Sequence, residues 1–316
     1  MVTLLVLQYK ASQKLPRQLS EFYDRLFQTL LQRHDGTKPG FARTRRCNLD
    51  DGEYRRVFEM VSMLLKGEDG QCFSSDTIYE AVSKSLSDLE LEAKATPYTE
   101  DIIRITCLIL REGAQHRFIH KSVQEYYAAS YVARKPDRWA KSFYGAVLDN
   151  REWRKWSQEL EFLSEIDAHR YQKYYELPAI LEFLDSDQAK VKEGTPQVSQ
   201  EWLHRQLDKV QIRPPGKRSW TFSFTPGSSP IRLLFMREIR KRVSDIFDEQ
   251  NWQGHLLDED ADGNGIFGTV LLKQEPFSDP MRAIGKKFYS SMVDRAREIL
   301  TQIEKEEDDH ILSNLM

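Results

Sequence analysis

The sequence predicts a mostly α-helical protein with a small α+β domain at its C-terminal end. Apolar residues recur at helical spacing through most of the first 185 residues, and β-branched runs typical of strands are short. A polar stretch over residues 186–200, with Gly194 and Pro196, precedes a region in which strands and helices alternate. The length of 316 residues corresponds to about two domains.

Composition narrows the classes of protein to consider. The 46 Lys and Arg residues nearly balance the 49 Asp and Glu residues, giving a net charge of −3. This balance argues against nucleic acid or an anionic membrane as the main partner. No apolar run reaches the roughly 18 residues of a membrane span. The cysteines are odd in number and widely spaced, which indicates reduced thiols in a cytoplasmic protein: Cys47, Cys72 and Cys107.

Residues 1–46 form the first predicted segment, which is helical. Pro16 opens an amphipathic helix, and Asp35 with Gly36 ends it. The apolar stripe of this helix holds Leu19, Phe22, Leu26 and Leu30. A stripe of this kind at the very start of a chain predicts that the chain continues a longer protein. Whether Met1 is the true start stays open.

Residues 47–135 show a mixed pattern that we expect to form one domain. Two helices are predicted over residues 50–86, and Ser74 or Ser75 can cap the second. They are followed by a predicted strand over 102–110, a turn over 111–115, a returning strand over 117–119 and a helix over 122–134. The order helix, helix, hairpin, helix is that of a winged-helix domain.

The remaining chain divides into two further predicted domains. Residues 136–190 are helical and rich in aromatic side chains. Residues 191–316 form the small α+β domain, which we expect to act as a sensor. Its predicted strands cover 220–224 and 266–272, and its predicted helices cover 231–249 and 281–306.

The segment FIHKSVQEYYAASYVA, residues 118–133, is the most informative part of the chain. Ser122 followed by Glu125 predicts a capping box, so the helix begins just after His120. His120 then lies where a strand gives way to a helix N-terminus, whose free N–H groups and partial positive charge favour a phosphate. A structural role for His120 is the alternative interpretation of the same position.

This segment closely resembles the F-x-H-x-S-x-Q-E-[YF]-x-A-A pattern of NACHT-type NTPases of the STAND class. Residues 1–46 resemble the helical segment that follows the NTPase core in that family, so the resemblance covers residues 1–135. Val123 departs from the aromatic residue usual in the pattern. The matching positions are Phe118, His120, Ser122, Gln124, Glu125, Tyr127, Ala128 and Ala129.

The resemblance implies a role for each of these residues. The histidine of the family pattern contacts the β-phosphate of bound ADP and holds the resting state, so His120 is the expected nucleotide-sensing residue of an intact parent protein. The other seven positions are expected to be framework. The phosphate-binding P-loop of an NTPase, G-x-x-x-x-G-K-[ST], does not occur in the chain. The most similar stretch is residues 216–219. We therefore expect no catalysis by this chain alone.

The resemblance also implies partners and a process. A complete parent protein would bind ADP or ATP with Mg²⁺, through an NTPase core supplied in cis or in trans. We expect a sensed ligand or protein that the sequence does not name, and homo-oligomerisation on activation. Such proteins serve microbial defence against phage or programmed cell death, as signal-transducing switches. No cofactor is expected for this chain by itself.

Two other stretches of the sequence resemble binding motifs: an acidic stretch at residues 260–265 and a basic group at residues 237–242. Residues 260–265, DADGNG, match the first half of an EF-hand loop, but Leu271 occupies the position of the bidentate Glu. An acidic turn is the favoured interpretation, weak calcium binding is the alternative that stays open, and no metal site is predicted. A basic group, Arg237, Arg240, Lys241 and Arg242, is interpreted as a solvated helix face, because acids follow on the same helix.

The alternative function is a stand-alone winged-helix protein that binds nucleic acid. The predicted helix after the hairpin discriminates between the two functions. It has Lys121 as its one early cation, and Glu125 lies on the same face. The sequence therefore argues against nucleic acid as a partner.

Overall fold

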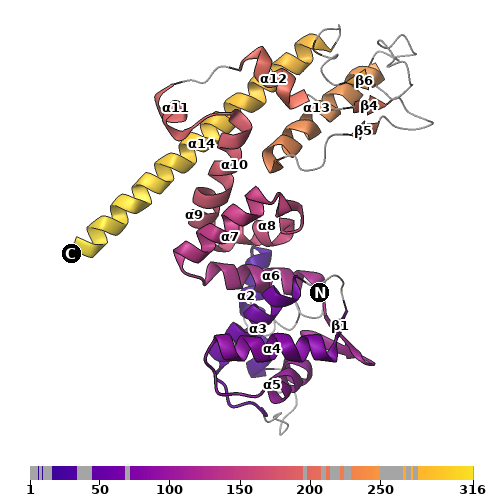
Figure 1. Cartoon of the computed structure of the whole chain (residues 1–316), viewed down its shortest axis with the longest axis vertical. Helices are drawn as coiled ribbons and strands as arrows, with labels where there is room; N and C mark the ends of the chain where they lie inside the picture. Colours follow the sequence, from indigo (N-terminus) through magenta and orange to yellow (C-terminus); the bar gives the residue numbers. More distant parts are fainter. Residues whose placement is uncertain are drawn as a thin grey trace. The chain divides into compact units, whose positions relative to one another are not determined.

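The computed structural model describes residues 6, 9, 16–33, 45–67, 72–194, 198–207, 211–213, 221–223, 229–249, 266–267, 272 and 277–315. The chain divides into two compact units. Unit 1 comprises Met1–Phe143 and Lys155–Ala168, and unit 2 comprises Tyr144–Arg154 and His169–Met316. The described residues are mostly helical, which confirms the predicted class (Figure 1). None of the described helices combines the length and the apolar character needed to cross a bilayer.

Unit 1 contains a three-stranded antiparallel sheet of order β1-β3-β2. The strands are β1 (Phe73–Ser74), β2 (Ile109–Glu112) and β3 (Gln115–Phe118). Ile109 pairs with Phe118 and Glu112 with Gln115, so the hairpin loop has only two residues. Gly113 takes a φ of +65° at the first of them, which is the requirement of a tight II′ turn. The predicted turn at this place is confirmed.

The helices of unit 1 are α2 (Leu19–Arg33), α3 (Asp51–Leu65), α4 (Ser75–Asp88), α5 (Ala95–Asp101), α6 (Lys121–Ala133), the start of α7 (Asp137–Asp149) and α8 (Ser157–Ile166). Asp50 and Glu53 form a capping box that begins α3, with reciprocal bonds of 2.8 and 2.9 Å. Ser74 caps α4, as predicted, by accepting from the Thr77 N–H at 3.1 Å.

The prediction of a strand over residues 102–110 is wrong for its first half. A π-helical turn, η1 (Ile102–Thr106), extends α5, and Cys107 then reverses the chain with a φ of 53°. Ile102 and Ile105 are both buried in the core, and the Thr106 hydroxyl donates to the Ile102 carbonyl at 2.7 Å. Burial of these isoleucines therefore outweighs their β propensity, and only Ile109–Glu112 pairs as a strand.

An aromatic core joins the helices of unit 1 to the sheet. The Phe58 ring of α3 lies 4.9 Å from that of Tyr127 on α6 and 6.0 Å from that of Phe118 at the end of β3. Phe27 of α2 lies 5.3 Å from Phe58. All four side chains are buried. Aromatic burial of this kind fixes the point at which β3 passes into α6.

Unit 2 is built on a long helix, α14 (Ser278–Leu315). The others in the described part are the end of α7, η2 (Glu152–Arg154), α9 (Ala168–Tyr171), η3 (Gln172–Glu176), α10 (Leu177–Leu184), α11 (Gln188–Glu193), α12 (Gln200–Leu207) and α13 (Pro230–Glu249). A second antiparallel sheet has the order β5-β4-β6 and holds β4 (Gln211–Arg213), β5 (Thr221–Ser223) and β6 (Ile266–Phe267). Both predicted helices are present, the last one longer than predicted, and residues 221–223 and 266–267 of the two predicted strands form β5 and β6.

One hydrophobic core serves α10 to α14. It takes residues from both sides of position 190, where composition placed a domain boundary, including Phe183, Trp202, Phe235 and Val293. Trp202 contacts Phe183 at 5.2 Å and Tyr289 at 4.9 Å between ring centroids. The acidic loop over residues 258–265 and the residues 216–219 lie outside the described part of the chain.

Candidate functional site

The predicted site lies where β3 passes into α6. Phe118 ends the strand with its side chain buried, and the Ile119 N–H donates to the Leu108 carbonyl at 2.9 Å. His120 is extended, with φ −153° and ψ 142°, and its side chain is exposed. The hairpin and the aromatic core therefore hold the backbone on both sides of an accessible histidine.

The cap of α6 differs from the predicted capping box. His120 is the N-cap residue, and its Nδ1 accepts from the Ser122 N–H at 3.2 Å. Ser122 lies in the first turn, and its Oγ bonds to His120 Nδ1 at 2.5 Å and to the Tyr23 hydroxyl. Glu125 is buried and pairs with Lys121 at 3.3 Å. The predicted start of the helix is correct, but the residue that caps it is His120.

The bond from the Ser122 N–H favours one tautomer of the neutral His120 ring. A backbone N–H can only donate, so Nδ1 carries a lone pair and the neutral ring holds its proton on Nε2. The Ser122 hydroxyl must then donate to Nδ1 and accept from the Tyr23 phenol. Among the described residues, Nε2 of His120 has no hydrogen-bond partner. In this tautomer His120 has one exposed N–H donor that no described residue engages.

Tyr23 is a site residue that sequence reasoning missed. It lies on α2, 99 positions from Ser122, and its ring is buried and stacks on Tyr126 at 5.3 Å. Burial raises the pKa of the Tyr23 hydroxyl, and the Ser122 bond offsets part of that rise. The phenol therefore stays protonated and donates at neutral pH. Tyr23 stands four residues after Leu19 on the apolar stripe, but local spacing gives no sign of its distant partner.

The remaining motif residues lie in the interior of unit 1. The Tyr127 hydroxyl donates to the Tyr23 carbonyl at 2.8 Å, and the Gln124 amide lies 3.5 Å from the Ser62 carbonyl. Ala128 and Ala129 are fully buried on α6. These side chains anchor α6 to α2 and α3 and do not reach an open surface.

Two backbone N–H groups at the start of α6 already donate to acceptors within the chain. The Ser122 N–H donates to the His120 side chain, and the Val123 N–H donates to the His120 carbonyl at 3.0 Å. The expectation that free N–H groups at this terminus favour a phosphate is therefore wrong for these two amides.

A network of charged and polar side chains links α2, α3 and α6. The buried Glu59 carboxylate accepts from Arg55 Nε at 2.8 Å, Ser130 Oγ at 2.7 Å and Arg134 Nε at 3.0 Å. Arg55 also reaches Asp24 at 2.7 Å. Burial alone would lower the pKa of Arg55, but Glu59 and Asp24 outweigh it and raise the pKa. Each buried charge is thus paired, as stability requires.

A second buried acid in unit 1 is less well compensated. Glu159 on α8 is fully buried and pairs with Lys66 Nζ at 2.7 Å. Burial raises the pKa of Glu159, and the ammonium of Lys66 offsets only part of that rise. Lys66 in turn lies over the Trp156 ring at 5.7 Å. The pair packs α8 against the end of α3 and provides no open acid or base.

The other side chains singled out from the sequence bring no further site together in the described part of the chain. Arg237, Arg240 and Lys241 are exposed on α13, whereas Arg242 is half-buried. Among the described residues, no three His, Cys, Asp or Glu side chains gather as a metal site. The cysteines Cys47, Cys72 and Cys107 form no disulfide.

No family model, curated protein or solved structure gives a significant match to this chain.

Proposed function

We propose that this chain is the regulatory and sensing region of a NACHT-type signal-transducing NTPase. The proposal starts from the resemblance of residues 118–129 to the family motif. Topology supports it. A winged-helix domain has the order helix, strand, helix, helix, strand, strand, with the third strand in the middle of the sheet. In unit 1 the elements α3, β1, α4, α5, β2 and β3 follow this order, and the sheet has the order β1-β3-β2. On this proposal α3 to β3 form the winged helix, and α6 follows it.

The observation that carries the proposal is the bond from the Ser122 N–H to Nδ1 of the exposed His120 ring. A neutral imidazole with Nδ1 engaged by Ser122 presents Nε2–H as a donor, and a phosphate oxygen is a strong acceptor. One such contact present in the resting state and absent in the active state biases a two-state arrangement by about 1.5–3 kcal/mol. His120 would in this way stabilise the ADP-bound state of the parent protein.

The other steps of the switch would be carried out by the NTPase core and by residues 191–316. An NTPase core, in cis or in trans, would supply the phosphate cradle and the Mg²⁺ site and would exchange ADP for ATP. Residues 191–316 would sense a ligand or protein, and release of His120 would permit homo-oligomerisation. Antiviral defence or programmed cell death in the cytoplasm is the proposed process. The chain itself would carry out no catalysis.

Purification of the assembly from cells that express the chain tests this proposal. A tag on α14 should recover a P-loop NTPase, in the same polypeptide or as a separate chain, with bound ADP detected by chromatography after denaturation. The purified 316-residue chain should bind no ADP by calorimetry. Recovery of the chain without any NTPase, or tight ADP binding by the chain alone, would show the proposal to be wrong.

The charge of the third helix in the proposed winged helix disfavours the nucleic-acid alternative. The third helix of the proposed winged helix is α5 with η1, not the Lys121–Ala133 helix considered from sequence. Its accessible charged side chains are one acid, Glu100, and one cation, Arg104, because Asp101 is buried and accepts from the Tyr54 hydroxyl. A helix that enters a DNA groove needs an excess of cations.

A further inference from the structure

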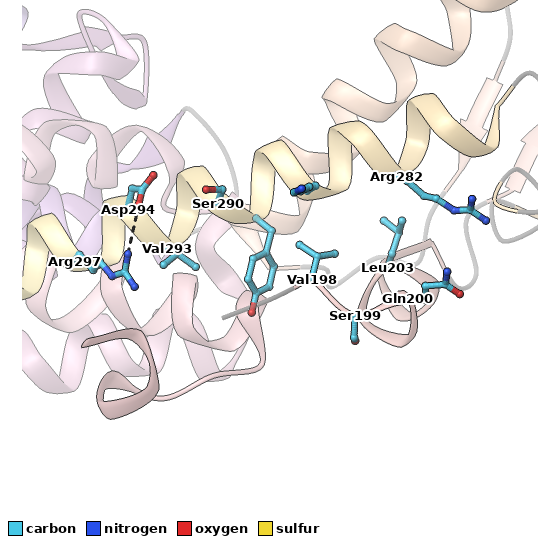
Figure 2. A pocket seen from close by; sticks show the side chains of 11 residues that line it. Val198, Ser199, Gln200, Leu203, Arg282, Ser290, Val293, Asp294 and Arg297 are labelled. Carbon is cyan, nitrogen blue, oxygen red and sulfur yellow. Dashed lines mark ion pairs between the residues drawn. The ribbon is translucent and has the colours of Figure 1, made fainter. Parts of the chain in front are cut away.

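A groove in unit 2 runs along α14 beside the start of α12. Its volume is about 540 Å³, which lies within the range of small-molecule sites. Figure 2 shows its two sides: one formed by residues 198–203 and the other by side chains of α14, with Arg282 near one end and Arg297 near the other.

The floor of the groove is apolar. Leu203, Tyr289 and Val293 are buried and line it together with the half-buried Val198. Gly285 permits the close approach of α12 to α14, because a Cβ there would lie 2.9 Å from Leu203 Cδ1. Since the packed core of unit 2 holds these side chains, the apolar surface is formed before any ligand arrives.

The rim of the groove carries excess positive charge. Arg282 and Lys286 stand one turn apart on the same face of α14. Arg282 lies 3.7 Å from the Asp279 carboxylate, outside the groove, and donates to the Leu272 carbonyl at 3.3 Å. Asp294 is the one carboxylate among the described lining residues, and it lies 3.8 Å from Arg297. Arg297 also donates to the Val191 carbonyl at 2.9 Å. Lys286 is exposed, and no described side chain or carbonyl forms a hydrogen bond or ion pair with it.

We propose that this groove binds a small organic anion. Its phosphate, sulfonate or carboxylate group would lie against Lys286 and Arg282, and its apolar body would cover Leu203, Tyr289 and Val293. The rise from residue 286 to 293 is about 10 Å along the helix, the length of a fused aromatic ring system with a substituent. Only the role of such a ligand as the sensed signal rests on the proposed function; binding itself does not.

A pair of fluorescent probes tests the site on the full chain. 8-Anilinonaphthalene-1-sulfonate has the anion and the apolar body, whereas N-phenyl-1-naphthylamine has the same body without the charge. We expect saturable binding of the sulfonate, about tenfold weaker in Lys286→Gln because one charge-assisted contact is lost. Lys287→Gln, next to it and outside the groove, should keep the affinity within about twofold. The uncharged probe should bind more weakly and should not respond to Lys286→Gln.

A second matched pair tests the location by filling the groove. Ser290 lines the groove and Ser291 does not, and both are exposed. Ser290→Trp should abolish sulfonate binding, and Ser291→Trp should preserve it. Absence of saturable binding, equal effects of the two lysine variants, or equal effects of the two serine variants would each overturn the proposal. Because no NTPase is present in this experiment, a negative result here does not bear on the proposed contact between His120 and ADP.

Discussion

At the scale of single residues, the chain of bonds from Tyr23 through Ser122 to His120 sets what the site can donate. The neutral His120 ring should carry its proton on Nε2, because Nδ1 accepts the Ser122 N–H. Nitrogen-15 NMR of the isolated chain near pH 8, with the His120 signals assigned through His120→Gln, should show a pyridine-type Nδ1 and a pyrrole-type Nε2. A dominant Nδ1–H tautomer would remove the donor that the proposed phosphate contact requires.

Part of this site was predictable from sequence and part was not. The position of His120 at a strand-to-helix junction follows from local pattern, and so does the start of α6. The capping residue does not, because Ser122 and Glu125 offered a plausible local cap while their side chains are engaged by Tyr23, His120 and Lys121. Bonds across 99 positions leave no periodic signal.

Glu159 makes stability depend on pH in a defined direction. Its pKa is higher in the folded chain than in the unfolded one, mainly because of burial. Its stabilising contribution is therefore full below the unfolded pKa and is lost as the pH rises through the raised folded pKa. Urea unfolding should show that Glu159→Gln gains stability relative to the wild type between about pH 4 and pH 7.

The control for this experiment is Glu161→Gln, an exposed acid on the same helix. Its stability relative to the wild type should not change over that pH range. A relative loss of stability by Glu159→Gln as the pH rises would mean that the Lys66 pair outweighs the desolvation of the carboxylate.

At the scale of elements, helical spacing predicted the long helices well and failed where a segment is too short to show a period. The run of β-branched residues after α5 has the composition of a strand, yet Ile102–Thr106 is a π turn. Its isoleucines are buried where α5 ends, and strand pairing starts only after the reversal at Cys107. Tertiary contacts decided this conformation, and composition cannot report them.

Two glycines inside helices of unit 2 should respond oppositely to alanine. Gly145 on α7 has open space where the alanine Cβ would lie, so Gly145→Ala should raise the unfolding free energy by about 0.5–1 kcal/mol. Gly285→Ala would press on the buried Leu203, and overpacking should outweigh the helix gain by about 1 kcal/mol. Chemical denaturation measures both. In a Leu203→Ala background Gly285→Ala should become stabilising, and its failure to do so would exclude this contact as the cause.

At the scale of the whole molecule, the length predicted about two domains, but the place where the chain divides into two units was not visible in the sequence. Composition suggested four segments, and the structure has two compact units whose chain segments interleave between residues 143 and 169. The core of unit 2 extends across the polar stretch at residues 186–200. Polarity marks exposed segments, but it does not tell whether the helices on either side share a core.

The release of ADP from the intact NTPase assembly tests the central claim most directly. A fluorescent ADP analogue is bound, chased with excess ADP, and followed for the wild type, for His120→Ala and for Lys121→Ala, its exposed neighbour. We predict about tenfold faster release for His120→Ala, because one charge-assisted hydrogen bond is lost, and release within about twofold of the wild type for Lys121→Ala. Equal release rates for the wild type and His120→Ala would contradict the claim that this histidine holds the resting state.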